Sequence, residues 1–234
     1  MSIGENNQSG CMLAEDVRRY YLETMDIQVW QAREQQVEDI TNVSAPGDVI
    51  WQQLEQAVSS CTKCELHTSR TQTVFGTGNK NAELLIIGEA PGRDEDVQGE
   101  PFVGRAGQLL NAMLAAIGFE REQVYIANIL KCRPPNNRDP KPEEADACAP
   151  WLQQQIGLVQ PEVILALGRI AAHNLLNTDQ SLAALRGKQY NYAGFPLIVS
   201  YHPAYLLRKP VEKRKSWQDL KRVKSLLNSY GSPT

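Results

Sequence analysis

Four short apolar runs lie beyond residue 80, and segments with helical spacing separate them. The runs cover residues 83–88, 124–130, 162–167 and 196–200. Mainly apolar runs of this length, such as the four consecutive apolar residues 84–87, are typical of strands that are covered on both faces. The segments between them predict helices at 106–117, 142–157 and 169–177, with a last helix near 212–229.

This alternation of strand and helix predicts an α/β fold with a parallel sheet and helices on both of its faces. Pro150 lies inside the second helix and is expected to kink or split it. Upstream of the first strand, Asp48 is a candidate N-cap for a helix that carries Ile50, Leu54 and Cys61 on one face.

The first 47 residues differ in character from the rest of the chain. Leu13–Met25 has helical spacing, and Ser44-Ala45-Pro46-Gly47 is typical of a linker. We therefore expect an acidic, partly helical N-terminal extension at 1–47, which could dock a protein partner, and one domain at 48–234. A chain of 234 residues is long enough for one α/β domain and such an appendage.

Charge is unevenly distributed along the chain. Residues 1–47 carry eight acidic residues and three arginines, whereas the chain from Arg208 onward carries eight basic residues and two acidic ones. The net charge of −3 therefore does not exclude nucleic acid, because a local basic stripe can bind phosphates. A solvated helix face would carry the same charges.

The sequence contains no membrane or export signal that we recognise. No apolar run approaches the roughly 20 residues that cross a bilayer. The N-terminus lacks the basic and then apolar pattern of a signal peptide. We expect a cytoplasmic protein that does not contact membranes.

Four of the five cysteines form a pattern that suggests metal binding. Cys61 and Cys64 form a C-x₂-C pair, and Cys132 and Cys148 follow as single residues. Four thiolates could complete a tetrahedral metal site or hold a [4Fe-4S] cluster. The long gap before Cys132 argues against a compact zinc finger, although buried free cysteines remain an alternative. Cys11 is left over.

The turn after the first apolar run reads Gly88-Glu89-Ala90-Pro91-Gly92. Ligands of parallel sheets bind beyond the carboxyl ends of the strands, where this turn falls. Its glycines permit a sharp bend and a close approach to a ligand. Glu89 is therefore a candidate for chemistry, and an ordinary turn with an exposed acid is the alternative.

Three further positions have side chains suited to a planar, charged ligand. Phe102, in a loop between Gly and Pro residues, is expected to be exposed and could stack on a ring. Arg105 opens a helix, whose first N–H groups favour anions. Asn128 is a polar amide in an apolar strand; its donor and acceptor match the O4/N3–H edge of uracil, although a structural role is also open.

The fourth strand runs directly into Tyr201-His202-Pro203-Ala204-Tyr205-Leu206-Leu207-Arg208. His202 falls at the carboxyl end of its strand, on the same side of the sheet as Glu89. Two adjacent leucines followed by Arg208 could form an apolar wedge beside phosphate contacts, as the extrusion of a base from DNA requires.

Taken together, these motifs resemble a family 4 uracil-DNA glycosylase, the iron–sulfur branch of its superfamily. The resemblance covers roughly residues 50–228 and is specific as a set. It implies a three-layer αβα sandwich with a central four-stranded parallel sheet and a [4Fe-4S] cluster on Cys61, Cys64, Cys132 and Cys148. It also implies a monofunctional base-excision enzyme that hydrolyses the glycosidic bond of uracil in DNA and has no lyase activity. We expect this enzyme to be a monomer.

The resemblance also implies roles for individual residues. Gly88 and Ala90 line the uracil site, Phe102 stacks on the base and Asn128 reads its edge. His202 hydrogen-bonds uracil O2 as the bond breaks. Arg105, Leu206 and Arg208 contact DNA, with the region of Leu206 as the wedge.

The residue that handles the attacking water is left open by the sequence. In the best-known branch of the superfamily an aspartate stands at the third position of the turn, where this chain has Ala90. Glu89 is the first candidate to replace it, followed by Glu95 and Asn137. Two other readings are a binding module for nucleic acid or a polymerase partner, without catalysis, and an iron–sulfur redox protein, which no nucleotide-binding motif supports.

Overall fold

The computed structural model describes residues 17, 22, 24, 25 and 46–230, and the chain divides into two compact units, Met1–Val43 and Ser44–Thr234. In the first unit Val17, Leu22 and Thr24 are helical. Met25 is in a turn, and the other residues of the predicted N-terminal helix, like Cys11, lie outside the described residues. The extension at 1–47 and the domain at 48–234 stay predictions.

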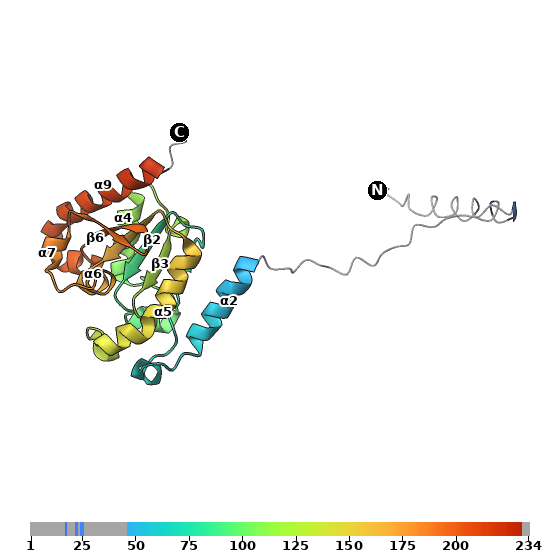
Figure 1. Cartoon of the computed structure of the whole chain (residues 1–234), viewed down its shortest axis with the longest axis horizontal. Helices are drawn as coiled ribbons and strands as arrows, with labels where there is room; N and C mark the ends of the chain where they lie inside the picture. The colour runs from blue at the N-terminus through green and yellow to red at the C-terminus, as the bar shows by residue number, and fades with distance from the viewer. Residues whose placement is uncertain (1–16, 18–21, 23, 26–45, 231–234) are drawn as a thin grey trace, which may run out of the picture. The chain divides into compact units, whose positions relative to one another are not determined.

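The second unit is built on a central sheet (Figure 1). Its six strands have the order β1-β3-β2-β4-β6-β5. The four central strands are parallel, as the apolar runs predicted: β3 (Tyr125–Asn128), β2 (Leu84–Gly88), β4 (Val163–Leu167) and β6 (Phe195–Ser200). Two short strands that were not predicted, β1 (Thr77–Gly78) and β5 (Gln189–Tyr192), pair antiparallel at the edges. The α/β class is confirmed, with six strands rather than four.

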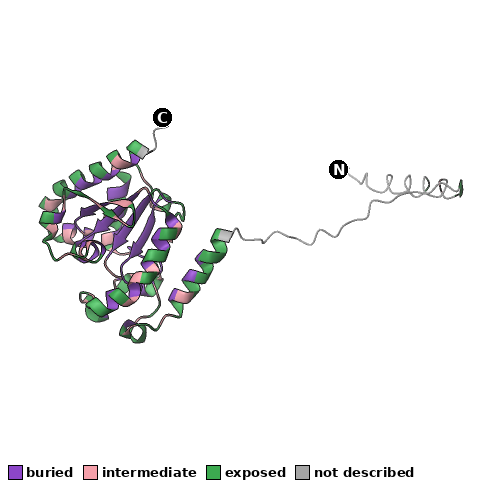
Figure 2. Ribbon diagram, in the orientation of Figure 1, coloured by how far each residue is buried: buried purple, intermediate pink, exposed green. Residues whose placement is uncertain are grey.

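Helices cover both faces of the sheet, because successive side chains of each strand point to opposite sides. Leu85 and Ile87 of β2 pack in one layer, and Leu84 and Ile86 pack in the other. The first layer contains α2 (Pro46–Ser59), α5 (Pro142–Val159), α6 (Arg169–Leu176) and α7 (Leu182–Leu185); the second contains α4 (Arg105–Ala115), α8 (Pro203–Arg208) and α9 (Lys213–Tyr230). Figure 2 shows the buried strands between them.

Two helices differ from the sequence-based prediction. Helix α2 begins at Pro46, whose missing N–H costs nothing in the first turn, so Asp48 lies inside the helix and is not its cap. Trp51 of this helix is buried, whereas Ile50 is exposed. Helix α5 continues through Pro150, so it is not split there, and the alternative expectation of a kink stays a prediction. No helix in the described part of the chain is long and apolar enough to span a membrane.

The carboxyl ends of the central strands are tied together by hydrogen bonds. Gly88 and Asn128 are register partners in β2 and β3. Beyond them, the N–H of Ile129 donates to the Gly88 carbonyl (3.0 Å), and the N–H of Leu130 donates to the Glu89 carbonyl (3.1 Å). The turn after β2 is therefore fixed to the segment that follows β3.

Candidate active site

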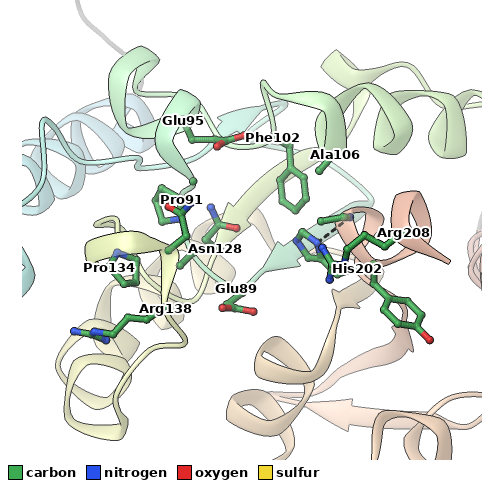
Figure 3. A pocket seen from close by; sticks show the side chains of 15 residues that line it. Glu89, Pro91, Glu95, Phe102, Ala106, Asn128, Pro134, Arg138, His202 and Arg208 are labelled. Carbon is green, nitrogen blue, oxygen red and sulfur yellow. Dashed lines mark hydrogen bonds between the residues drawn. The ribbon is translucent and has the colours of Figure 1, made fainter.

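The carboxyl edge of the sheet opens into a cavity of about 440 Å³. Side chains converge on it from the turns after β2, β3 and β6 (Figure 3). Most predicted site residues line it: Glu89, Ala90, Glu95, Phe102, Asn128, Asn137, His202 and Arg208. Pro91, Gly92, Ala106, Pro134, Arg138, Ala204 and Tyr205 complete the lining.

His202 is held in one orientation at the first turn of α8. Its Nδ1 accepts the backbone N–H of Ala204 (3.2 Å), the bond that is dashed in Figure 3. A ring nitrogen that accepts a hydrogen bond carries no proton, so the proton of the neutral ring is assigned to Nε2. Burial, followed by the nearby Arg208 charge, lowers the pKa of His202 to about 4. His202 is therefore a neutral hydrogen-bond donor at pH 7.

The ring of Phe102 stacks on the imidazole of His202, with centroids 5.4 Å apart and planes inclined by 29°. Phe102 is only 6% exposed. The expectation of an exposed phenylalanine is therefore wrong, because the ring packs against His202 and the core beneath α4. The ring nevertheless lines the cavity.

Asn128 is buried at the end of β3, with 2% of its surface exposed. Its Oδ1 has no hydrogen-bond partner among the described residues. A buried acceptor without a partner costs about 1–3 kcal/mol, which a ligand donor would recover. Gly88 leaves room for this amide: a Cβ there would collide with Asn128 Oδ1 and lie 2.7 Å from the Phe102 ring.

Glu89 lines the cavity from the turn after β2 and is half-buried. Burial raises its pKa to about 7. The Asp139 carboxylate raises the pKa further, and the Arg169 guanidinium opposes the rise. Arg169 and Asp139 themselves form an ion pair of 2.6 Å. Near neutral pH Glu89 is thus present both with and without its proton.

The other two candidate polar groups are already engaged in hydrogen bonds. Glu95, on α3 (Arg93–Gln98), accepts the backbone N–H groups of Val103 (3.1 Å) and Gly104 (3.2 Å) through Oε1. Asn137, in the 3₁₀ helix η3 (Pro135–Asn137), accepts the Nε–H of Arg133 (2.8 Å) through Oδ1. Both therefore hold loops at the rim of the cavity.

The three predicted DNA contacts lie in different settings. Arg105 is exposed at the start of α4, and Arg208 is exposed at the end of α8 and lines the cavity. Leu206 is 1% exposed and belongs to the core between α4 and α9. Leu206 is therefore not exposed in this structure, and its predicted contact with DNA stays a prediction; Leu207, its neighbour, is half-buried.

Sequence reasoning missed Arg138, which lines the cavity and forms an ion pair with buried Glu144 (2.5 Å). It also missed Pro134 and Tyr205. All three lie within motifs already singled out around Asn137 and His202, so proximity to those residues was the available signal.

The four predicted cysteines line one small cavity beside α5, together with Arg70, Lys131 and Trp151. Arg70 donates to Cys132 Sγ (3.1 Å), and the backbone N–H of Lys131 donates to Cys148 Sγ (3.3 Å). Cationic groups and N–H donors aimed at sulfur stabilise thiolates.

Four thiols have the chemistry that a thiolate-bound metal or cluster requires. Burial raises the pKa of Cys132, and it raises the pKa of Cys148 to about 11, so both thiols keep their protons at pH 7 unless a metal displaces them. Among the described residues, no three His, Cys, Asp or Glu side chains form a group that could hold a metal ion. What the structure provides is one cavity lined by four thiols.

Comparison with known proteins places the chain among relatives. A model of the uracil DNA glycosylase superfamily matches residues 75–221. The type-4 uracil-DNA glycosylase of Archaeoglobus fulgidus is 46% identical over 177 residues, covering 72% of this chain and 89% of that protein. For those of Thermotoga maritima and Pyrobaculum aerophilum the identities are 41% and 45%, covering 76% and 72% of this chain and 95% and 90% of each relative. The chain therefore belongs to the uracil DNA glycosylase superfamily, within its type-4 group.

Proposed function

We propose that this protein removes uracil from DNA by hydrolysing the N-glycosidic bond, which releases free uracil and leaves an abasic site. The observation that carries the proposal is the meeting of three groups at one cavity: a neutral histidine donor, a phenylalanine ring stacked on it, and a buried amide oxygen without a partner. The names of the type-4 relatives support the same activity.

Recognition of the base follows from the donors and acceptors of the cavity. Uracil carries a donor at N3 and an acceptor at O4, which pair with Oδ1 and Nδ2 of Asn128. Cytosine has an acceptor at N3, so it would leave the Asn128 oxygen buried and unpaired. Phe102 supplies the apolar face on which the base stacks.

A base in duplex DNA reaches this cavity only when its nucleotide leaves the stack. Arg105 and Arg208 are exposed at the ends of helices near the cavity and are suited to phosphate contacts. Because Leu206 is buried, we assign the wedge that fills the vacated position to Leu207, on the same turn of α8.

Bond cleavage places negative charge on the departing uracil and positive charge on the sugar. Nε2–H of His202 donates to uracil O2, where the negative charge develops, and its neutral ring need not give up a proton. A fixed donor of this kind is worth about 2–4 kcal/mol in the transition state. The carboxylate of Glu89 stabilises the sugar cation and orients the attacking water, while Glu95 and Asn137 hold the surrounding loops.

The four cysteines are proposed to hold a [4Fe-4S] cluster. Such a cluster would supply no chemistry at the glycosidic bond, and its four cysteine ligands would tie the segment after α2 to α5 and to the segment after β3. A monomeric state, a cytoplasmic location and a partner-docking role for residues 1–47 belong to the same proposal and rest on the sequence alone.

One assay tests the activity. A labelled oligonucleotide with a single uracil is incubated with the protein and then treated with alkali, and strand cleavage at the uracil is expected. His202→Ala should retain the fold and lose most of the activity. Tight binding of the oligonucleotide without cleavage by the unmodified protein would instead support a non-catalytic binding module.

A further inference from the structure

Phe102 has a backbone conformation that phenylalanine rarely adopts. Its φ is 55°, in the left-handed region that favours glycine. A bulky residue keeps such a conformation only when its surroundings enforce it. Relaxation of this backbone would rotate the ring away from His202, on which it stacks, so the groups that hold the backbone also set the position of the ring.

Phe102 lies in the loop between α3 and α4. Arg121, in the 3₁₀ helix η2 (Arg121–Gln123), binds two backbone carbonyls of this loop. One terminal nitrogen donates to the Phe102 carbonyl (3.3 Å), and the other donates to the Pro101 carbonyl (2.5 Å). The first nitrogen also donates to Oδ1 of Asn111 on α4 (3.3 Å), which orients the guanidinium. The planar fork of arginine can bind two successive carbonyls at once, which a lysine ammonium cannot reproduce with the same geometry.

Two backbone N–H groups of the same loop are bound by a different residue, Glu95. The Glu95 carboxylate accepts the N–H groups of Val103 and Gly104, the two residues that follow Phe102. At Gly107 a Cβ would collide with the Phe102 carbonyl, so this glycine allows the loop to lie close to α4. Arg121 and Glu95 therefore form hydrogen bonds with the peptide groups on the two sides of Phe102.

We propose that Arg121 is a positioning residue for uracil recognition and acts through Phe102. Arg121 is not among the residues that line the cavity, so it does not touch the base. By holding two carbonyls, it keeps the Phe102 backbone in its left-handed conformation and the ring parallel to the bound uracil. The inference rests on the proposed function of the cavity.

A double-mutant cycle on the full chain tests this role, with Arg121→Gln, Phe102→Ala and the double variant. The readouts are kcat/KM for uracil release, affinity for free uracil by calorimetry, and melting temperature. Arg121→Gln should lower both kcat/KM and uracil affinity about tenfold, as expected for lost hydrogen bonds to a charged donor. In the Phe102→Ala variant, the Arg121→Gln substitution should lower kcat/KM and uracil affinity less than about twofold, because the ring that Arg121 positions is absent. Arg93→Gln, at an exposed arginine of α3, is the matched control.

The outcomes separate the two proposals. Equal losses from Arg121→Gln with and without Phe102, or no loss at all, would overturn the positioning role while uracil release by the unmodified protein stands. Absence of uracil release by the unmodified protein would overturn the proposed function instead. If Arg121→Gln melts below the assay temperature, Arg121→Lys replaces it in the cycle, because lysine keeps the charge but not the planar fork. Arg121→Lys should lower kcat/KM and uracil affinity less than Arg121→Gln does, and this loss should again disappear in the Phe102→Ala variant.

Discussion

The side-chain ammonium of Lys131 donates a hydrogen bond to the backbone carbonyl of Asn128, with Nζ and O 3.0 Å apart. Lys131 is 1% exposed, and its backbone N–H donates to Cys148 Sγ. A single buried residue therefore contacts both the cysteine cavity and the strand end that carries the proposed uracil-reading amide. Lys131 therefore links the backbone of Asn128 to the cysteine cavity by two hydrogen bonds.

Lys131→Met should separate activity from stability. Methionine keeps the apolar length of the side chain but removes the donor to Asn128, so uracil release should fall roughly tenfold. Replacing a buried charge by a well-packed apolar group is often neutral or stabilising, so the melting temperature should not fall. Single-turnover assays and thermal melts measure both, with exposed Lys188→Met as control. Unchanged activity would show that Asn128 is held without Lys131.

The pH dependence of activity should report Glu89. Because burial raises its pKa to about 7, the carboxylate form becomes predominant only above that pH. The kcat/KM for uracil release should therefore rise with pH through about 7, and Glu89→Gln should be slow and lack this rise. His202, with its pKa near 4, contributes no step in this range. A pH profile from 5 to about 9 on both proteins measures the effect; the same rise in Glu89→Gln would assign it to another group.

The same carboxylate should lower stability at high pH. The folded protein binds the Glu89 proton more tightly than the unfolded chain does, since the pKa rises from the ordinary 4.5 to about 7 on folding. The free energy of unfolding therefore decreases as pH rises through this window, by about 1–3 kcal/mol from this group. Urea unfolding of Glu89→Gln should show a gain over the unmodified protein at about pH 8.5 that shrinks towards pH 5.

The central strands could be predicted from sequence because they are buried on both faces and therefore uniformly apolar. The edge strands could not. Strand β1 has two residues, and β5 (Gln189–Tyr192) alternates exposed and half-buried side chains with no apolar run. Their strand conformation follows from pairing with β3 and β6, which is a tertiary effect that local composition does not encode.

The site residues that lie at the carboxyl ends of parallel strands could be predicted from the sequence. Glu89, Asn128 and His202 each lie where a parallel strand ends, and the structure brings all three to one cavity. The burial of Leu206 could not be read from the sequence, because adjacent leucines on a short helix are equivalent until the packing partner is known. Arg121 carried no signal either, since its contacts are to backbone carbonyls of a distant loop.

The two leucines of α8 should now give opposite phenotypes. Leu206→Ala removes a core side chain and should cost about 2–5 kcal/mol of stability. Leu207→Ala should leave stability nearly unchanged but slow uracil release from double-stranded DNA more than from single-stranded DNA, because only the duplex has a gap to fill. Thermal melts and assays on paired substrates measure this. Equal slowing on both substrates would argue against a wedge at Leu207.

Iron content should test the cysteine site. Protein purified without oxygen is expected to be brown and to contain about four irons per chain. Cys148→Ser should lose the iron and the colour and should lower the melting temperature, since the proposed ligands would tie α5 to the segment after α2. Colourless protein with one zinc per chain would identify a different metal centre, provided that loss of a cluster in air has been excluded.

Alanine substitutions at Gly88, beside the cavity, and at Gly157, in helix α5, should have opposite effects. At Gly88 a Cβ would collide with Asn128 Oδ1 and crowd the Phe102 ring, whereas at Gly157 nothing lies within 4 Å of the new atom. Gly88→Ala should therefore displace the two groups proposed to bind uracil and reduce kcat/KM by about 10²-fold or more. Gly157→Ala, inside α5, should keep full activity and raise stability by up to about 1 kcal/mol, because alanine is the better helix former. Free-uracil calorimetry and urea unfolding on both variants distinguish the cases: full uracil affinity in Gly88→Ala would mean that Asn128 and Phe102 do not form the base site.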